Sequence, residues 1–295
     1  MKLTLGPILF HWPADRIADF YARIADEAPV DRVVLGETVC SKRAPFNARA
    51  ILDAAERLER AGKEVALSTL ALPTTPRERR MIADLVGAGF LLEANDVTLL
   101  RHLPAEAPFL VGPLVNVYGE GTLRWLGARG ARTVCLPPEL SIAQAGGMAG
   151  CGVETEIWAY GRAPLALSGR CYHARLAGKS RDSCQFVCEA DPDGLPVDTV
   201  DGQPFLAVNG VQTLSEAHVN LASDLDAVRR AGVSRLRLSP HTDDMVAVMQ
   251  IFRDAANGQI DGAEALARLA RLVPRRTFAN GYAAGRRGID WTHAS

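Results

Sequence analysis

Residues 31–72, DRVVLGETVCSKRAPFNARAILDAAERLERAGKEVALSTLAL, decide the fold because two short apolar runs flank one amphipathic segment. The first run, 31–36, and the last, 64–72, have the length and composition of buried strands. The segment between them, 47–62, has helical periodicity and closes on a glycine suited to a helix C-terminus. Regular strand–helix–strand order predicts strands that pair in parallel.

The same alternation extends along the chain in both directions. On the N-terminal side, the apolar run 3–9 is followed by an amphipathic segment at 13–28. Further apolar runs that we interpret as strands lie at 89–96, 108–119, 131–139, 153–161 and 234–240. These make about eight strand units, which predicts an α/β, TIM-barrel-like, mostly parallel barrel. An open doubly wound sheet is the competing fold, but no G-x-G-x-x-G follows the first strand.

The late position of the last strand predicts an insert within one barrel-like domain that spans residues 1–295. Seven strand units come early and one comes late, so we place the insert at about 162–222. Part of it, 189–213, is rich in turn residues and contains short β runs, which is typical of a hairpin-like excursion.

Composition and charge narrow the class of protein. The chain has 48% hydrophobic and 23% charged residues, which is typical of a globular protein. Its formal net charge of −1 argues against general nucleic-acid binding. No apolar run is long enough for a transmembrane segment, and the N-terminus reads as a strand rather than a signal peptide. We therefore predict a cytoplasmic location, where thiols stay reduced.

Polar side chains follow several predicted strands at their carboxyl ends. In a parallel barrel these ends meet on one rim, where active sites form. Four of these side chains are candidates for catalysis or substrate contact: Glu37, Glu93, Asn95 and Asn116. Asp96 and Ser141 are better explained as helix N-caps, because their oxygens accept hydrogen bonds from the first turn of a helix.

Three of the six cysteines occur in one charged segment, SGRCYHARLAGKSRDSCQFVC at 168–188. Free cysteine prefers apolar burial, so Cys171, Cys184 and Cys188 in this segment favour a metal site over three unrelated thiols. A tetrahedral site needs a fourth ligand. Cys40 is the natural choice because it follows the second strand, at the same rim.

The other cysteines and the kind of metal are less distinctive. Cys135 lies inside an apolar strand and Cys151 starts another, so both are expected to be small buried residues. His173 is expected to face away or to form a local hydrogen bond rather than bind metal. The Cys184-x-x-x-Cys188 spacing permits zinc, and four thiolates suit an iron–sulfur cluster equally well.

These motifs carry a resemblance to a known family over nearly the whole chain. The segments that carry it are LGETVCSKR at 35–43, LSTLAL at 67–72, LEAND at 92–96, AYGRAPLALSGRCYHAR at 159–175, NGVQT at 209–213, RLSP at 237–240 and NGY at 280–282. The chain resembles the short iron–sulfur members of the collagenase-like peptidase family that act in bacterial ubiquinone biosynthesis. VCSKR joined to the later RCY and C-x-x-x-C is the most specific part of the pattern.

The resemblance implies a cofactor, a partner and a reaction. It implies a [4Fe-4S] cluster on Cys40, Cys171, Cys184 and Cys188, and a heterodimer with a longer relative, UbiU. The pair would hydroxylate the aromatic ring of ubiquinone precursors without molecular oxygen, with prephenate as the oxygen donor. The gap between Cys171 and Cys184 is shorter than in close relatives, but loop length has little effect on whether a site can close.

Three alternatives belong to other functional classes. Relatives in the wider family hydroxylate RNA bases, although the net charge of −1 disfavours a nucleic-acid substrate. Other relatives carry the name of peptidases, yet no Ser-His-Asp or H-E-x-x-H pattern stands out in this sequence. A zinc-stabilised hydrolase or structural protein is the third alternative.

Overall fold

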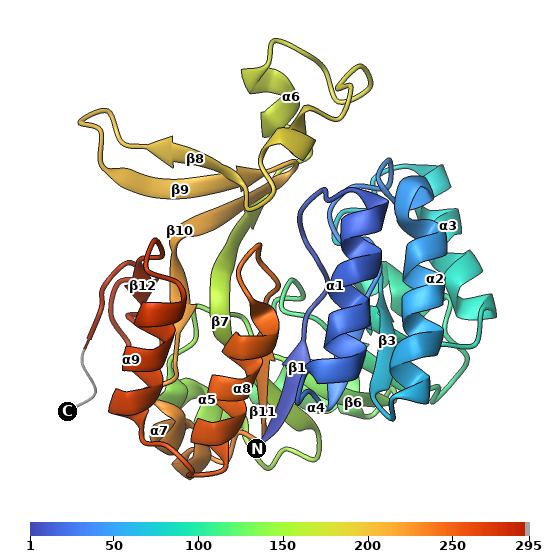
Figure 1. Cartoon of the computed structure of the whole chain (residues 1–295). Coiled ribbons are helices and arrows are strands. Elements are labelled where there is room, and N and C mark those ends of the chain that lie inside the picture. The colour runs from blue at the N-terminus through green and yellow to red at the C-terminus, as the bar shows by residue number, and fades with distance from the viewer. Residues whose placement is uncertain (293–295) are drawn as a thin grey trace.

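The computed structural model describes residues 1–292, and within them eight parallel strands close a barrel (Figure 1). Strand β11 pairs with both β1 and β7 and so closes the ring. The barrel strands are β1 (Lys2–Leu5), β2 (Arg32–Leu35), β3 (Glu64–Ser68), β4 (Leu91–Ala94), β5 (Phe109–Val111), β6 (Ala131–Cys135), β7 (Glu154–Leu167) and β11 (Arg235–Leu238). The predicted parallel barrel is confirmed, and the open doubly wound sheet is wrong. The end of the predicted domain, 293–295, lies outside the described residues.

Helices surround the barrel and bury one face each. Between β1 and β2, α1 buries Ile17, Tyr21 and Ile24, whose spacing places them on one side of a helix. The elements of the outer layer are α1 (Ala14–Glu27), α2 (Ala44–Arg60), α3 (Pro76–Gly87), the 3₁₀ helix η1 (Val97–Arg101), α4 (Glu120–Gly127), α5 (Ile142–Met148), α7 (Leu225–Arg230), α8 (Met245–Ala256) and α9 (Gly262–Leu272). No helix within residues 1–292 is long and apolar enough to cross a membrane.

Both predicted N-caps are confirmed. The Asp96 carboxylate accepts a hydrogen bond from the backbone N–H of Thr98 at 2.8 Å, at the start of η1. Ser141 accepts one from the backbone N–H of Gln144, whose side chain accepts from the Ser141 backbone in return. These bonds satisfy N–H groups that have no partner within the helix.

Strand β7 is longer than the barrel wall and continues into an arm, which we define as residues 162–220. Its first part pairs in parallel with β6 and β11, and its outer part pairs antiparallel with β10 (Gln212–Asn220). Gly161, at the crossing, has φ +103°, and a Cβ there would approach Ser239 and His241 to 2.8 Å. Only glycine fits this close approach without a shift of its neighbours.

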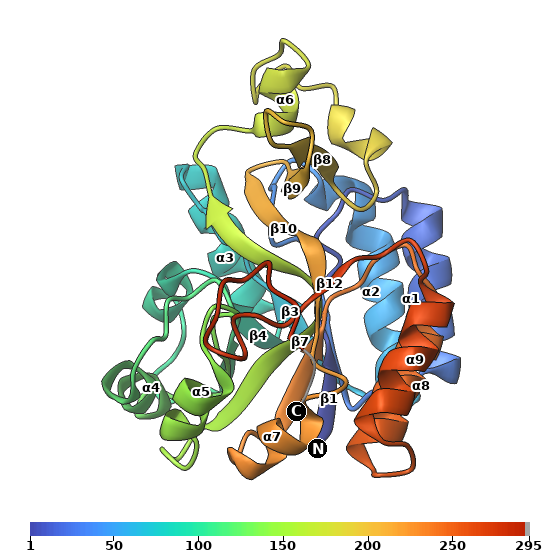
Figure 2. The ribbon, with the colours of Figure 1, turned by 90° about the vertical axis from the view of Figure 1, so that its left-hand side faces the viewer.

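The arm stands at the carboxyl ends of the barrel strands (Figures 1 and 2). It contains α6 (Tyr172–Leu176), η2 (Val187–Ala190), β8 (Leu195–Asp198) and β9 (Pro204–Asn209), followed by β10. Strands β8, β9 and β10 pair antiparallel in chain order, and β12 (Phe278–Ala279) adds to β10 in parallel. The arm therefore places the cysteine-bearing segment above the rim where β2 ends.

Charged side chains lie inside the barrel beside a small apolar cluster of Val34, Ala66 and Leu110. On β11, Leu236 and Leu238 belong to the main apolar cluster, whereas Arg237 donates to the carboxylates of Glu93 and Glu156. These three charged side chains are each no more than 2% exposed. Barrel interiors are more often packed with branched apolar side chains. Here buried ion pairs join β4, β7 and β11 across the interior.

Candidate functional site

The four cysteines of the predicted metal site line one cavity. Cys40 follows β2, Cys171 precedes α6, and Cys184 and Cys188 lie before and within η2. Cys188 is buried and the other three are half-buried. The cavity measures about 20 Å³, which is room for one water molecule. Side chains that lie more than a hundred positions apart in the sequence thus converge at the rim under the arm.

The segment between Cys184 and Cys188 has an unusual backbone. Gln185 and Phe186 both adopt left-handed conformations, with φ of 50° and 53°. Residues with bulky side chains rarely do so, and such strain tends to collect at functional sites. The Phe186 ring packs on the ring of Phe46 at a centroid distance of 4.8 Å, which fixes this segment against α2. The backbone reversal lets both thiols reach the same cavity.

Lys42, two residues after Cys40, ties the cysteine-bearing loop to the barrel. Its Nζ donates to the carbonyl oxygens of Arg181 and Asp182 at 2.8 and 3.0 Å. The same Nζ lies 3.7 Å from Cys184 Sγ. Lys42 and Arg43 belong to the VCSKR motif, but the sequence does not show that Lys42 contacts the distant cysteine-bearing loop.

Glu78 of α3 forms a second attachment for the loop. Its carboxylate accepts from the Arg181 guanidinium at 2.6 Å and from the Ser41 hydroxyl at 2.8 Å. Burial alone would raise the pKa of Glu78, but the hydrogen bonds from Ser41 and Thr75 and the charge of Arg181 lower it to about 2. The ionised carboxylate therefore helps to hold the loop on the barrel.

Arg43 is a buried cation at the wall of the cysteine cavity and is 1% exposed. Its guanidinium donates to the Leu9 carbonyl and to the Asn209 side-chain oxygen, both at 3.0 Å. Within the described part of the chain, its Nε has no hydrogen-bond partner and no carboxylate lies within ion-pair distance. Arg43 therefore forms no ion pair with a carboxylate in residues 1–292, although the charge of Glu37 acts on it.

The thiols and Arg43 influence one another. Burial raises the pKa of both Cys40 and Cys188, and the positive charge of Arg43 opposes this effect at each thiol. Conversely, burial lowers the pKa of Arg43, but Glu37 and the Cys188 and Cys40 thiols outweigh burial and raise it. Arg43 therefore favours the thiolate form that a metal ligand requires.

His173 lines the cavity, but both of its ring nitrogens already have partners. Nδ1 accepts from the backbone N–H of Gly210 at 2.8 Å, and Nε2 lies 3.1 Å from the Asp191 carboxylate. Burial lowers the pKa of His173, which Asp191 partly offsets. The expected local hydrogen bonding of His173 is confirmed, and its role is to join the loop to β9 and β10.

Among residues 1–292, no three His, Cys, Asp or Glu side chains are arranged to hold a single metal ion. This holds for the four cysteines as they stand. A four-iron cluster is larger than one ion, so its ligand sulfurs stand further apart than those around one ion.

Glu37 shapes the turn that presents Cys40. Its Oε1 accepts from the backbone N–H groups of Val39 and Cys40 at 2.7 and 2.9 Å. Burial raises the pKa of Glu37, while Arg43 and these two N–H groups oppose the shift. Of the four polar candidates at strand ends, Glu37 is the one placed beside the cysteine cavity.

The other three candidates lie elsewhere. Glu93 pairs with Arg237 at 2.7 and 2.9 Å, and the Asn95 amide donates to Glu93 and to Ser68 at 3.1 and 2.9 Å. Both residues therefore belong to the polar network inside the barrel. Asn116 is exposed in the loop after β5. The structure brings Glu93 and Asn95 together but places Glu37 and Asn116 apart from them.

The two remaining cysteines differ from each other. Cys135 lies in β6 and is 1% exposed, which confirms the expected burial. Cys151 is less buried than expected, because it is only half-buried in a bend before β7, where it packs against the edge of the core. Gly150 and Gly152 on either side have φ of 84° and 85°, so the chain turns here and the strand starts only at Glu154.

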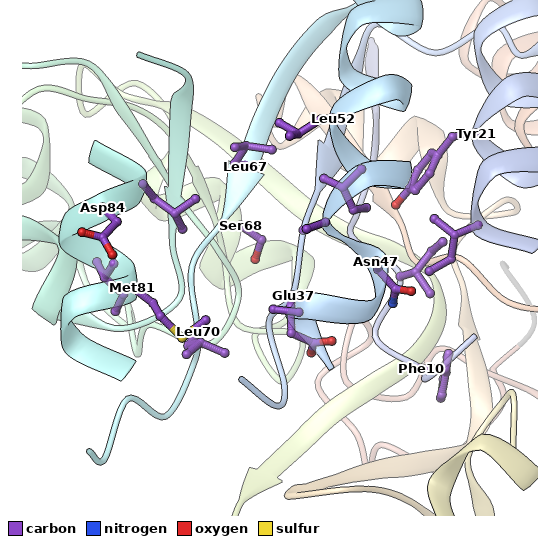
Figure 3. A pocket seen from close by; sticks show the side chains of 18 residues that line it. Phe10, Tyr21, Glu37, Asn47, Leu52, Leu67, Ser68, Leu70, Met81 and Asp84 are labelled. Carbon is purple, nitrogen blue, oxygen red and sulfur yellow. The ribbon is translucent and has the colours of Figure 1, made fainter. Parts of the chain in front are cut away.

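A larger cavity of about 380 Å³ lies next to the cysteine-bearing rim (Figure 3). It is bounded by α1, α2 and α3 and by the carboxyl ends of β1, β2 and β3, and Glu37 forms part of its wall. The central mouth of the barrel, in contrast, leaves a cavity of only about 10 Å³. The larger cavity could not be predicted from the sequence, because each wall belongs to a different element.

Comparison with known proteins places the chain in a family. A collagenase of Porphyromonas gingivalis (strain ATCC BAA-308 / W83) is 23% identical over 227 residues, which cover 69% of this chain and 52% of that protein. The chain thus spans about half the length of this curated relative. A structure of tryptophan synthase from Mycobacterium tuberculosis matches 99% of this chain and 93% of its own at 12% identity, but its TM-score of 0.34 supports no conclusion. The family model for peptidase family U32 matches residues 17–293. The chain therefore belongs to peptidase family U32.

Proposed function

We propose that this chain is the iron–sulfur subunit of an oxygen-independent hydroxylation system, of the type called UbiV. The system would act on the aromatic ring of ubiquinone precursors, with UbiU as the partner chain and prephenate as the oxygen donor. Four thiolates would hold a [4Fe-4S] cluster: Cys40, Cys171, Cys184 and Cys188. The observation that carries the proposal is that these four thiols line one cavity.

The donor set and its charge fit such a cluster. Each ligand thiol gives up its proton on binding, so the site becomes strongly negative. Arg43 supplies a buried positive charge at the cavity wall and has no carboxylate within ion-pair distance in residues 1–292.

The residues of this chain have separate tasks in the proposed site. A bound cluster of this kind supplies one-electron transfer. Glu37 orients the turn that carries Cys40 through its two backbone hydrogen bonds. Phe186 covers one wall of the cavity and packs on Phe46, which limits the access of water. Lys42 and Glu78 hold the loop in place from the barrel side.

Peptide hydrolysis is the second candidate, because the family and the curated relative both carry the names of peptidases. The two functions demand different metal contents. Protein purified without oxygen should contain about four iron and about four sulfide per chain and show the broad visible absorbance of an iron–sulfur protein. Protein that contains zinc and no iron, and that cleaves gelatin, would instead support hydrolysis.

The reaction itself requires a cellular test. A bacterium that lacks its own UbiV-type gene should regain ubiquinone synthesis without oxygen when it expresses this chain. Label from ¹⁸O-prephenate should then appear in the quinone. An iron-loaded protein that fails to restore synthesis alongside a matched UbiU would contradict the proposed reaction.

The partner is tested separately. Tagged UbiU, co-expressed with this chain, should retain it through gel filtration under nitrogen. If the two chains elute apart while both hold iron, the heterodimer is wrong.

A further inference from the structure

The ammonium group of Lys42 contacts one of the four thiols directly. Lys42 follows Cys40 by two residues and is half-buried. Its Nζ lies 3.7 Å from Cys184 Sγ, which is hydrogen-bond distance for a sulfur acceptor. Among the hydrogen bonds of residues 1–292, this is the one that joins a lysine to a thiol. A cation thus lies against one sulfur at the edge of the cysteine cavity.

The number of donors on this group leaves one N–H for the sulfur. An ammonium has three N–H donors and no acceptor. Two of them point to the carbonyl oxygens of Arg181 and Asp182, at 2.8 and 3.0 Å. In the described part of the chain Lys42 forms no ion pair with a carboxylate, so Cys184 Sγ is the third acceptor. The N–H bonds point to the corners of a tetrahedron, and the two carbonyl oxygens therefore fix the direction of the third bond.

An aromatic ring also holds the ammonium in place. The centroid of the Phe186 ring lies 5.9 Å from Lys42 Nζ, within the range of a cation–π contact. Phe186 packs in turn on Phe46 of α2. A lysine has a flexible four-carbon stem, and at a surface its charge is usually free in water. Three hydrogen bonds and a ring contact instead give Lys42 one defined position.

The anchoring contacts belong to the same short segment as the thiol. Arg181 and Asp182 precede Cys184 by three and two residues. A shift of this segment therefore carries the two carbonyl oxygens and the sulfur together. The contact between Nζ and Sγ depends on residues 181–184 and not on the placement of the rest of the arm.

A second lysine of the same loop has a different partner. Lys179 Nζ donates to the side-chain oxygen of Gln185, and no hydrogen bond within residues 1–292 joins it to a thiol. The two lysines carry the same charge and contact the same loop. They differ in the acceptor, which is sulfur for Lys42 and an amide oxygen for Lys179.

A cation that donates to a ligand sulfur affects the two oxidation states of an iron–sulfur site unequally. Reduction adds one negative charge to the site, so a nearby positive charge stabilises the reduced form more than the oxidised form. Hydrogen bonds to the sulfurs act in the same direction and are among the features that set the reduction potential.

We propose that Lys42 donates its third N–H to the Cys184 thiolate in the metal-bound protein and thereby raises the reduction potential of the site. This inference rests on the iron–sulfur function proposed above. Lys42 acts through Cys184, so it is a positioning residue and not a catalytic one. Its effect favours a site that accepts an electron over a site that only braces the loop.

The first test is a redox titration of the whole protein under nitrogen. Dithionite supplies the one electron that the site gains, and visible absorbance follows the reduction. At a fixed potential Lys42→Met should lower the ratio of reduced to oxidised sites at least threefold, which for one electron is a fall of about 28 mV in the midpoint potential. Lys179→Met removes the same charge from the same loop and should change the ratio less than 1.5-fold. Equal shifts in both variants would overturn the proposal.

The second test does not require Lys42→Met to retain its metal. Unchanged protein labelled with ¹⁵N at the lysine side chains is reduced with dithionite, and pulsed electron paramagnetic resonance should detect a weak ¹⁵N coupling. Lys42→Arg keeps a positive charge and N–H donors, so it should retain iron and a potential closer to that of the unchanged protein than Lys42→Met does. It should lose the lysine ¹⁵N coupling. The absence of this coupling in the unchanged protein, or its persistence in Lys42→Arg, would overturn the proposal.

The iron and sulfide content of each sample separates this inference from the proposed function. Unchanged protein with about four iron, whose potential does not respond to Lys42→Met, would refute the role of Lys42 and leave the cluster in place. Protein that contains no iron after purification under nitrogen would refute both.

Discussion

Two buried arginines, Arg43 and Arg237, sit at the same end of the barrel but have opposite surroundings. Arg237, inside the barrel, pairs with the carboxylates of Glu93 and Glu156 at 2.7 to 3.0 Å. Arg43, under the arm, donates to two uncharged oxygens, lines the cavity of the four thiols and interacts with Glu37 without forming an ion pair. Both guanidinium groups are at most 2% exposed.

The difference shows which of the two buried cations has carboxylate partners at ion-pair distance. Burial would lower the pKa of Arg237, but Glu93 and Glu156 outweigh it and raise that pKa. The barrel interior thus contains its own counter-charges. Arg43 forms no ion pair with a carboxylate in residues 1–292, and only the charge of Glu37 and the cavity thiols favours its charged form. We therefore expect negative charge in the cysteine cavity to stabilise Arg43 further. Bound thiolates would supply that charge.

The largest expected effect is that of Cys40→Ala, which removes one source of the missing negative charge. Three thiolates leave one iron without a protein ligand, so the iron content should fall to background and anaerobic activity should be lost. Iron and visible absorbance of protein purified under nitrogen provide the measurement. Full iron with normal quinone synthesis in this variant would refute the ligand assignment.

Cys135→Ala is the matched control. Cys135 is buried in β6 away from the cysteine cavity, so alanine should cost only the packing of a small side chain, about 1 kcal/mol. Iron content should remain unchanged. Loss of iron without general unfolding would mean that Cys135 had been wrongly excluded as the fourth ligand.

The second prediction concerns the barrel interior, where Arg237 has carboxylate partners. Arg237→Met removes the cation and leaves the Glu93 and Glu156 carboxylates buried together, which should lower the free energy of unfolding by about 3–5 kcal/mol. Urea unfolding of the iron-free protein measures this. The triple variant with Glu93→Gln and Glu156→Gln should recover most of the loss, and no recovery would mean that packing, not charge, explains it.

The third prediction concerns Arg43. The effect of its replacement on the free energy of unfolding should depend on whether metal is bound. In iron-free protein, Arg43→Met removes a cation that has no ion pair together with two hydrogen bonds, so the net change should be small. In iron-loaded protein it removes the counter-charge, and the loss should be about 1–3 kcal/mol greater. Urea unfolding of both forms under nitrogen gives the comparison.

Arg43→Lys serves as its control. It keeps the positive charge but loses the fork of N–H donors, so it should retain more iron than Arg43→Met. Equal losses in the loaded and iron-free forms of Arg43→Met would remove the basis for contrasting the two arginines.

Much of the barrel could be predicted because its signals are local. Strand β3 is a short apolar run between turn residues, and Asp96 and Ser141 precede their helices as caps do. The extent of β7 was missed because Gly161 and Pro164 interrupt its pattern. In the structure Gly161 permits the passage into the arm, and Pro164 lies at an irregularity in the pairing with β10.

The site was less predictable because its signals are not local. The sequence could group the cysteines by spacing and by strand ends, but it could not show that Arg43 lacks a carboxylate. Glu93 looked like a rim residue, and its partner Arg237 lies 144 positions away. Nothing in the sequence connects Leu67 with Asn47 across the same cavity, because contact between separate elements depends on how α2 and α3 diverge.

The smallest expected effect concerns the partly buried ion pair between Arg181 and Glu78 at the edge of the loop. The folded-state pKa of Glu78 is about 2, below its ordinary value of 4.5. Its stabilisation is therefore fully present above about pH 5 and is lost as the pH falls toward 2. Because Arg181 is 23% exposed, we discount the contribution to about 1–2 kcal/mol.

Glu78→Gln should remove this part of the acid sensitivity. The difference in unfolding free energy between the unchanged protein and the variant should be largest at pH 7 and should shrink by about 1 kcal/mol at pH 3. Iron-free protein is used, so that acid release of metal does not contribute. Asp53→Asn, in an exposed ion pair with Arg49, is the control and should differ little from the unchanged protein at either pH. If the Glu78→Gln difference in unfolding free energy were the same at both pH values, the charge of the carboxylate would not hold the loop. Other contacts would then have to hold the loop beside Arg43.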